Sequence, residues 1–231
     1  MKVKLIIAVI ALASSFNTLA TSIDVRHEIS DTSQHDHKDR VLISHRFANG
    51  FGLSLEAKWK QDSSKDERGK AFHEQISNGT DIVASYLYKL NDTVSIQPGF
   101  SMESNSSTNG YRPYLRGQYT INEYFYVASR YRYEYKRTAS KGSDGDEKIN
   151  RGDLWLGYKI NAQWQMEYNY VYKKSDKVLF DNKKHDYEHD VKLSYRWDKN
   201  WKPYIQVGNV KQDSTSDHRQ TRFRAGVAYS W

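Results

Sequence analysis

The sequence predicts an all-β protein: a twelve-stranded antiparallel transmembrane β-barrel, preceded by a cleavable signal peptide. Three observations predict this fold class. Alternation of polar and apolar residues recurs along the chain, whereas helical periodicity is almost absent. The connections between the extended segments alternate between short turns and long polar loops. The chain is also rich in interfacial aromatics, with 18 Tyr and 6 Trp, while only 38% of its residues are hydrophobic, which excludes a protein built from apolar helices of roughly 20 residues.

Residues 1–20 are predicted to be the signal peptide, and residues 21–231 the barrel. Lys2 and Lys4 precede the apolar run LIIAVIALA, and NTLA then leads to cleavage after Ala20. The run is too short to span a membrane; the alternative is a buried N-terminal strand or helix. Cleavage removes two lysines and no acid, so the formal charge falls from +7 to 7 − 2 = +5. That excess suits an anionic partner. Since the chain contains no Cys, disulfides and thiolate chemistry are excluded.

The alternating segments are each close to the roughly 10 residues of a membrane-spanning strand. We expect strands at 22–30, 38–47, 51–61, 76–90, 94–102, 111–119, 124–137, 150–160, 163–173, 187–197, 201–211 and 219–231.

The connections between these segments alternate in length. FANGF, LNDT, TINE, INA and DKN are tight turns rich in Asn, Asp and Gly. The intervening loops, such as QDSSKDERGKAFHEQ and TASKGSDGDEKIN, are longer and polar. In outer-membrane barrels the short turns face the periplasm and the long loops face outside. A secreted β-sandwich is the competing fold, but its loops need not sort by parity, and its apolar faces would be richer in Ile, Val and Leu.

The stretch SRYRYEYKR (129–137) shows how each strand divides into two faces. Because successive side chains of a strand point to opposite sides, its tyrosines share one face and its arginines the other. We expect the tyrosines to face lipid or the interface and the arginines to face an aqueous lumen. The other predicted outward residues include Val41, Ile43, Phe51, Leu53, Leu55, Trp59, Val94, Ile96, Phe100, Leu154, Leu156, Trp164, Met166, Val191, Leu193, Ile205 and Val207.

The predicted inward face is polar and mostly basic. Its bases are Arg26, Arg40, Arg46, Lys58, Lys60, Arg112, Arg116, Arg130, Arg132, Lys136, Lys159, Lys173, Lys192, Arg196, Lys202, Arg222 and Arg224. Its acids are fewer: Asp24, Glu28, Glu56, Glu134, Asp153 and Glu167. Any single Arg could simply balance a neighbouring acid, but for the whole set we expect most bases to lack an inward partner. About twelve strands leave a narrow tunnel, so the lumen is predicted to attract anions.

Three features depart from the pattern. Segment 76–90 has apolar residues on both faces, and Leu42 and Trp155 fall inward. A local bulge or an aromatic contact in the lumen would explain them.

Five segments closely resemble the oligogalacturonate-specific porins of the KdgM type. They are DVRHE (24–28), HKDRVLISHRFANGFGLSLEAKW (37–59), YRPYLRG (111–117), VKLSYRWDKNWKPYIQVGNV (191–210) and RQTRFRAGVAYSW (219–231). The last ends on an aromatic, which resembles the terminal assembly signal of outer-membrane barrels, although Phe is more usual there than Trp231. Region 138–186 matches less clearly, which puts Lys159 and Lys173 in doubt as pathway residues.

The resemblance implies a monomeric outer-membrane channel for acidic oligosaccharides, with two facing tracks of basic lumen residues. The expected function is passive, anion-selective uptake of oligogalacturonates; the alternative is a sialic-acid channel of the same family. No cofactor, metal or nucleic-acid partner is expected. The candidate substrate-pathway residues are Arg26, Arg40, Arg46, Lys58, Arg112, Arg116, Arg130, Arg132, Lys192, Arg196, Lys202, Arg222 and Arg224.

An outer-membrane barrel enzyme, such as a lipase, is the rival function. A nucleophilic Ser needs a His base within hydrogen-bond reach. Ser44 and His45 are sequence neighbours, so on a strand they point to opposite faces and cannot pair. His35, Asp36, His37 and Asp39 could hold a metal, but a solvated loop is the expected interpretation. An adhesin is a further rival, although its loops would be short and the ordered basic face would have no role. We therefore expect no enzymatic activity.

Overall fold

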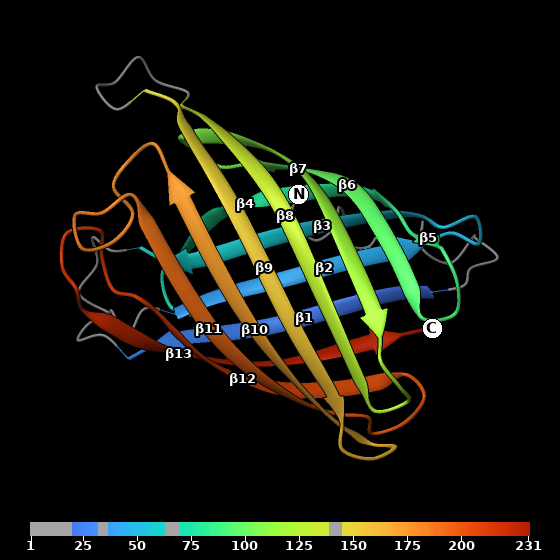
Figure 1. The fold of residues 1–231 in the computed structure, drawn as a ribbon. Coiled ribbons are helices and arrows are strands. Elements are labelled where there is room, and N and C mark those ends of the chain that lie inside the picture. Colours follow the sequence, from blue (N-terminus) through green and yellow to red (C-terminus); the bar gives the residue numbers. More distant parts are fainter. Residues whose placement is uncertain (1–19, 32–36, 63–69, 139–144) are drawn as a thin grey trace, which may run out of the picture.

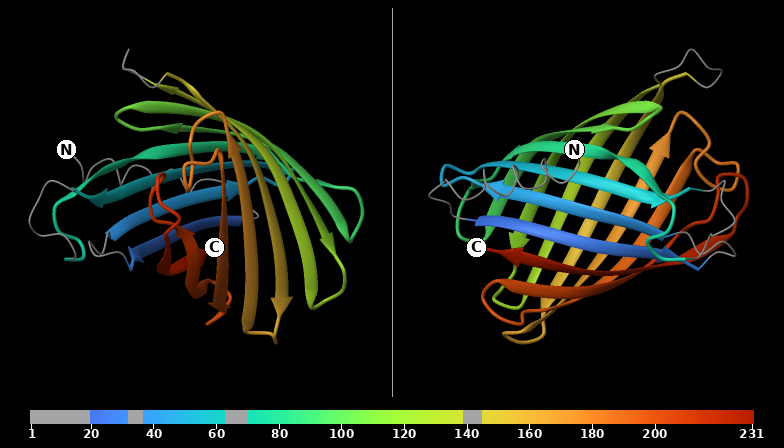
Figure 2. Two further views of the ribbon diagram at one scale, coloured as in Figure 1. Left: turned by 60° about the vertical axis from the view of Figure 1, so that its left-hand side comes forward. Right: turned by 180° about the vertical axis from the view of Figure 1, so that it is seen from behind.

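The computed structural model describes residues 20–31, 37–62, 70–138 and 145–231, so residues 1–19 of the predicted signal peptide lie outside the described residues. One antiparallel sheet closes on itself as a barrel (Figures 1 and 2). Its strands are β1 (Ala20–Ser30), β2 (His37–Arg46), β3 (Phe51–Gln61), β4 (Gln75–Tyr86), β5 (Tyr88–Lys89), β6 (Val94–Ser104), β7 (Thr108–Thr120), β8 (Phe125–Thr138), β9 (Glu147–Lys159), β10 (Trp164–Ser175), β11 (His185–Tyr195), β12 (Trp201–Lys211) and β13 (Arg219–Ser230).

The barrel wall is twelve strands around, as predicted, although thirteen strands carry labels. The two-residue β5 continues β4, so the two count as one strand of the wall. The backbone of Leu87 leaves the ladder between them and donates its N–H to Gly50 O at 2.9 Å. Neighbouring strands in sequence pair with each other, β4 pairs with β6, and β1 pairs with β13 to close the ring. A closed ring satisfies every strand edge, which a membrane-spanning sheet requires.

The predicted irregularity lies on β4. The register between β3 and β4 shifts between Ala57 and Trp59, and Gly79 adopts a φ of +100° beside it. A bulge of this kind inserts an extra residue and moves the following side chains to the other face. Segment 76–90 therefore combines a bulge near its start with a break at Leu87. The bulge does not account for Ile82 and Val83, which follow it in one continuous ladder and face opposite sides.

Each short turn is closed by the side chain of its Asn or Asp. The carboxamide or carboxylate oxygen accepts the N–H of the first residue of the next strand, at 2.7–2.9 Å. The pairs are Asn49 with Phe51, Asn91 with Val94, Asn122 with Phe125, Asn161 with Trp164 and Asp198 with Trp201. We call this end of the barrel the short-turn end. Residues Thr21 and Trp231 exchange backbone hydrogen bonds there, so the start of β1 and the C-terminus share that end.

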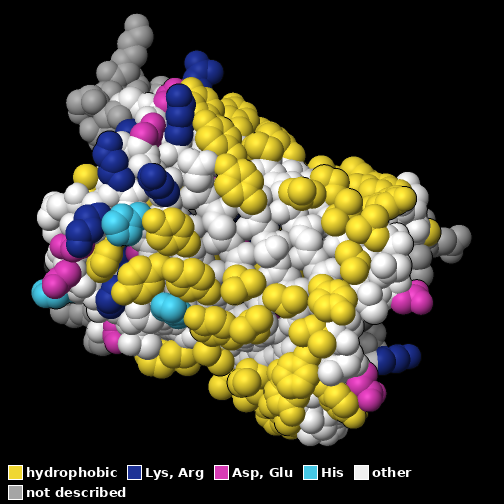
Figure 3. Space-filling view, in the orientation of Figure 1, with side chains coloured by type: hydrophobic (Ala, Val, Ile, Leu, Met, Phe, Trp, Pro, Cys, Tyr) yellow, Lys and Arg dark blue, Asp and Glu magenta, His cyan; other side chains and the backbone are white. Residues whose placement is uncertain are grey.

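The outward face is apolar. Ile205, Tyr131 and Leu115 are 57%, 57% and 54% exposed, and Phe51, Leu53, Leu156 and Val191 are also among the exposed large side chains. On the face seen in Figure 3, hydrophobic side chains cover the middle of the wall, and most charged side chains lie toward its ends. So large an apolar surface on a closed barrel is the surface that contacts lipid. Among the described residues, no helix has the length and apolar character needed to cross a membrane.

Candidate functional site

The lumen carries basic side chains on two opposite walls. One group, here the β8 array, comprises Arg112 and Arg116 on β7, Arg130 and Arg132 on β8, and Arg151 on β9. The other, here the β1 array, comprises Arg26 on β1, Arg40 on β2, Lys192 on β11, and Arg222 and Arg224 on β13. In the ring order of the strands β8 lies halfway round from β1, so the two arrays face each other across the lumen.

Cross-strand pairing brings the members of the β8 array together. Arg116 lies opposite Arg130 on the neighbouring strand, and Arg132 lies opposite Arg151. Like charges directly opposite each other destabilise a sheet unless other groups compensate them. Part of the compensation is aromatic: the guanidinium carbons of Arg116 and Arg130 lie 5.4 and 5.2 Å from the ring centroid of Trp155. The inward Trp155 is thus a lumen contact, as the sequence suggested.

Buried carboxylates compensate the rest of the β8 array. Asp153 accepts hydrogen bonds from Arg130 at 3.0 Å and from Arg151 at 2.7 Å. Glu134 accepts one from the Arg132 Nε at 2.8 Å, and lies 3.5 Å from the Arg112 Nε. Asp153 and Glu134 are 3% and 4% exposed. A carboxylate buried to that degree must be paired, so these acids belong to the wall and hold the guanidinium groups in place.

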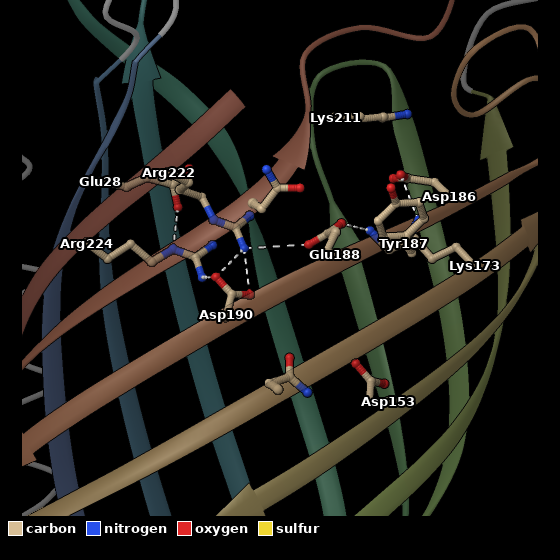
Figure 4. Close-up of polar contacts among 12 residues, drawn as sticks. Glu28, Asp153, Lys173, Asp186, Tyr187, Glu188, Asp190, Lys211, Arg222 and Arg224 are labelled. Atoms are coloured by element: carbon tan, nitrogen blue, oxygen red, sulfur yellow. Dashed lines mark hydrogen bonds and ion pairs between the residues drawn. The ribbon is translucent and has the colours of Figure 1, made fainter. Parts of the chain in front are cut away.

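The β1 array is held in the same way (Figure 4). Arg222 donates to Asp190 at 2.8 Å and lies 3.5 Å from Glu188. Arg224 donates from Nε to Glu28 at 2.6 Å and lies 3.8 Å from Asp190. Acidic and basic side chains therefore alternate from β11 through β13 to β1.

Two of the predicted bases on β2 and β3, Arg40 and Lys58, are also paired. Arg40 forms ion pairs with Asp24 and, at 3.2 Å, with Glu56. Lys58 pairs with Glu103, which also binds Arg112. A chain of alternating charges therefore continues from the β1 array toward the β8 array.

Three inward tyrosines lie against glycines of the neighbouring strand. Tyr204 lies opposite Gly226, Tyr126 opposite Gly157, and Tyr114 opposite Gly99. A Cβ placed on any of these glycines would overlap the ring of its partner. The rings lie flat on the wall because the glycines leave room for them, which keeps three large side chains out of the lumen. The Tyr204 ring also stacks under the Lys192 ammonium at 3.9 Å.

A cavity of about 500 Å³ lies between the arrays. On the side of the β8 array the cavity is lined by Arg151 and Trp155. Its other lining residues include Tyr204, Lys192 and Gln206. The remaining bases at its edge include Arg26, Arg40, Arg222 and Arg224. This volume is in the range of sites for small molecules, and its polar lining suits an anionic, hydroxyl-rich ligand.

Five of the thirteen candidate substrate-pathway residues have no carboxylate within 4.0 Å among the described residues: Arg46, Arg116, Lys192, Arg196 and Lys202. Their contacts are neutral. Arg46 donates to Gly50 O at 2.8 Å, Arg116 to Gln118 at 2.9 Å, and Lys202 to Gln165 at 2.9 Å. Arg46, Arg196 and Lys202 lie at or beside the short turns. The uncompensated positive charge is therefore weighted toward the short-turn end.

The expectation that most inward bases lack an inward partner is wrong. Arg40, Lys58, Arg112, Arg130, Arg132, Lys136, Lys173, Arg222 and Arg224 each have a carboxylate within 3.5 Å, and Arg26 has Glu28 at 4.0 Å. The sequence sorting missed the inward acids Asp81, Glu103, Glu147, Glu188 and Asp190, and the inward base Arg151. Counting back by two residues from the inward Lys192 would have found Asp190 and Glu188. Asp81 was missed because the bulge before it changes the alternation.

The rival catalytic arrangement is not formed. Ser44 hydrogen-bonds to Ser22 at 2.8 Å, and the Nδ1 of His45 hydrogen-bonds to Thr21 at 2.8 Å. The side chains of Ser44 and His45 therefore point to opposite faces of the sheet and do not contact each other. Within the described residues no cluster of His, Cys, Asp and Glu could hold a metal ion. His35 and Asp36 of the candidate loop lie outside the described residues.

Comparisons with known proteins agree with this geometry. Residues 14–231 match the family described as oligogalacturonate-specific porin protein (KdgM). The chain is 52% identical to the oligogalacturonate-specific porin KdgM of Dickeya dadantii, over 100% of both chains. It is 24% identical to the N-acetylneuraminic acid outer membrane channel protein NanC of Escherichia coli, over 99% of this chain and 98% of that one. A structure titled "KdgM porin in complex with disordered oligogalacturonate" is 46% identical, with a TM-score of 0.69 over 91% of this chain and 99% of that one.

Proposed function

Since the chain belongs to the KdgM family of outer-membrane porins, we propose that it takes up oligogalacturonates by passive, anion-selective diffusion along its basic lumen. The family is one of channels, which confirms that the chain is not an enzyme and that it resides in the bacterial outer membrane. The observation that carries the substrate proposal is the pair of arginine-rich arrays on opposite walls. The relative of known substrate specificity at 52% identity supports it.

Arginine is suited to this substrate. A guanidinium presents a planar fork that binds a carboxylate through two parallel hydrogen bonds. An oligogalacturonate carries one carboxylate on each sugar, so successive sugars can engage successive arginines along either wall. The neutral faces of the sugar rings would pack on Trp155 and on the tyrosines that lie along the wall.

The buried acids make passage reversible. A carboxylate of the substrate that binds Arg222 takes the place of Asp190 or Glu188, which are already within 3.5 Å. The guanidinium is therefore paired both before and after the exchange. The displaced acid keeps a second base nearby, since Asp190 lies 3.8 Å from Arg224 and Glu188 forms an ion pair with Lys173. Conduction requires sites that bind well enough to admit the ligand and weakly enough to release it. Exchange between similar partners meets both conditions.

Single-channel recording tests the proposal. The refolded protein in a planar bilayer should be anion-selective and should be blocked by trigalacturonate but not by neutral maltotriose. Tyr131→Phe, on the lipid face, is the matched control and should behave as wild type. A cation-selective pore, or block by both sugars alike, would refute the proposed substrate class.

N-acetylneuraminate is the second candidate substrate, favoured by the likeness to NanC over nearly the whole chain. It carries a single carboxylate and can occupy one array at a time, whereas an oligogalacturonate can span several bases. Stronger block by N-acetylneuraminate than by trigalacturonate at equal concentration would favour this second candidate.

We also propose that residues 1–20 are removed on export and that the barrel works as a monomer. Both arrays belong to one chain and enclose one lumen, so no second copy is needed to complete the pathway. N-terminal sequencing of the mature protein should begin at Thr21, and native mass spectrometry should give the mass of one chain. A start upstream of Thr21, or a stable trimer, would contradict these two expectations.

A further inference from the structure

The outer wall carries a basic patch at the long-loop ends of β8 to β10. It comprises Arg137, Lys148 and Lys174, and we call it the outer-wall patch. Register places its members side by side: Lys148 is opposite Tyr135 of β8, while Lys174 lies between Asn150 of β9 and His185 of β11. Figure 3 shows Lys and Arg side chains gathered at this end, beyond the edge of the hydrophobic band.

These three side chains are exposed and have no carboxylate within 4.0 Å among the residues that the structure describes. The nearby acids are engaged by backbone and hydroxyl groups. Asp176 accepts the N–H of Lys148 at 2.9 Å, and Asp146 accepts the N–H of Thr138 at 3.1 Å and the Tyr135 hydroxyl. The lumen bases, by contrast, are mostly held by acids. The positive charge of the outer-wall patch thus faces outward, with no carboxylate paired to it in the part of the chain that the structure describes.

The patch lies at the height of lipid head groups. Along β10, Lys174 follows the outward Tyr172, which is 42% exposed, by two residues, or about 7 Å of strand. Tyr187 of β11 is 37% exposed beside it. Aromatic residues of this kind mark the boundary between hydrocarbon and head groups, so the lysines project into the polar layer on the extracellular side.

The same height on the other side of the barrel has a different character. The outward residues near the long-loop ends of β1 to β3 include His27, Asp39 and Trp59, and His27 is bound to Asp39 at 2.7 Å. The outer-wall patch is therefore a local feature of one sector of the wall. A ring of basic residues needed only for solubility would not be confined in this way.

We propose that the outer-wall patch binds the phosphate groups of a phosphorylated glycolipid in the outer leaflet of the outer membrane. The sign of the charge, its exposure and its height above the aromatic boundary all fit a phosphate-bearing head group. Lys binds phosphate as a point charge and Arg as a fork. The adjoining tyrosines contact the upper part of the acyl chains, so one lipid molecule can engage both layers of the wall.

The test uses the full mature barrel, refolded in detergent, and measures binding of bis-phosphorylated lipid A and of its dephosphorylated form by native mass spectrometry. An interfacial cation contributes about fivefold to the affinity for an anionic lipid surface. Lys148→Gln and Lys174→Gln should each lower the affinity for the phosphorylated lipid by about fivefold, and the double variant by about 25-fold. Lys199→Gln, an exposed lysine in a short turn at the opposite end, is the matched control and should bind as wild type.

Two outcomes would overturn the proposal. One is wild-type binding by the double variant. The other is equal binding of the two lipids by the wild-type protein, which would leave only apolar contact. Because the patch lies outside the lumen, every variant should keep wild-type conductance, and that measurement also establishes that the variant barrels are folded. A dimer that dissociates in the double variant, with no lipid preference, would assign the surface to a second copy instead.

Discussion

Replacing Arg116 by Gln should lower anion selectivity more than removing a complete ion pair from the same lumen. Arg116 has no carboxylate within 4.0 Å among the described residues, and its contacts are Gln118 at 2.9 Å and the ring of Trp155. Its charge is therefore available to passing ions. Lys136 and Glu147, 3.2 Å apart, form a pair whose removal leaves the sum of lumen charge unchanged.

The size of the effect follows from Coulomb's law. A unit charge about 4 Å from a passing chloride contributes about 1 kcal/mol at the dielectric constant of water, and about 4 kcal/mol at the effective value near a protein surface. The lower figure corresponds to about fivefold in the partition of chloride into the lumen. A cation gains what the anion loses, so the permeability ratio changes by more than the chloride partition alone.

The assay is the reversal potential in a tenfold gradient of potassium chloride. Arg116→Gln should move it toward the potassium equilibrium potential, whereas the double variant Lys136→Gln/Glu147→Gln should stay close to wild type. At high salt the difference should shrink because the Debye length falls to about 3 Å at 1 M. Equal shifts for the two variants would refute the reasoning, since selectivity would then not depend on uncompensated charge.

Three further predictions concern other parts of the barrel. Gly157→Ala should lower single-channel conductance, because the added methyl overlaps the Tyr126 ring and pushes it toward the lumen; an unchanged conductance would show that the ring can move elsewhere. Trp155→Ala should weaken trigalacturonate block about two- to thirtyfold, since the stacked guanidinium groups lose a contact of about 0.5–2 kcal/mol, while the reversal potential in potassium chloride stays near that of wild type. In the loop after β12, the N–H and hydroxyl of Ser216 lower the pKa of Asp213 to about 2. A lowered pKa stabilises the folded loop above the ordinary pKa of Asp, near 4, and this contribution is lost as the pH falls toward 2. The protection of the loop amides, taken as exchange relative to the intrinsic rate at each pH, should therefore fall over that interval in the wild type, whereas in Asp213→Asn the protection should not change over it.

The strands could be predicted from the sequence because each is long enough for alternation to be unambiguous. Segment 201–211 coincides with β12, and segment 51–61 with β3. The prediction lost accuracy where alternation fails, at the β4 bulge and at the break before β5. A bulge depends on the pairing of two strands, and a single strand's sequence does not record it.

The inward orientation of the bases was predictable for the same reason, but their pairing was not. Arg224 meets Glu28 across the closure of the barrel, and Lys58 meets Glu103 on a strand that is not its neighbour. Such contacts depend on how far the ring curves and how the strands tilt. The exposed outer lysines are simpler, because alternation alone places them outside and no partner has to be found.

A lumen in which acids match most of the bases explains specificity better than a lumen of bare positive charge would. A fully uncompensated wall would bind a polyanion at many sites at once, and the ligand would leave too slowly for transport. In this barrel, the paired arginines can recognise carboxylates only by exchanging one partner for another, so recognition adds little net affinity. The uncompensated bases, weighted toward the short-turn end, then supply the modest net attraction that draws an anion inward. Selectivity for small ions and recognition of uronates should therefore depend on different residues of the same lumen.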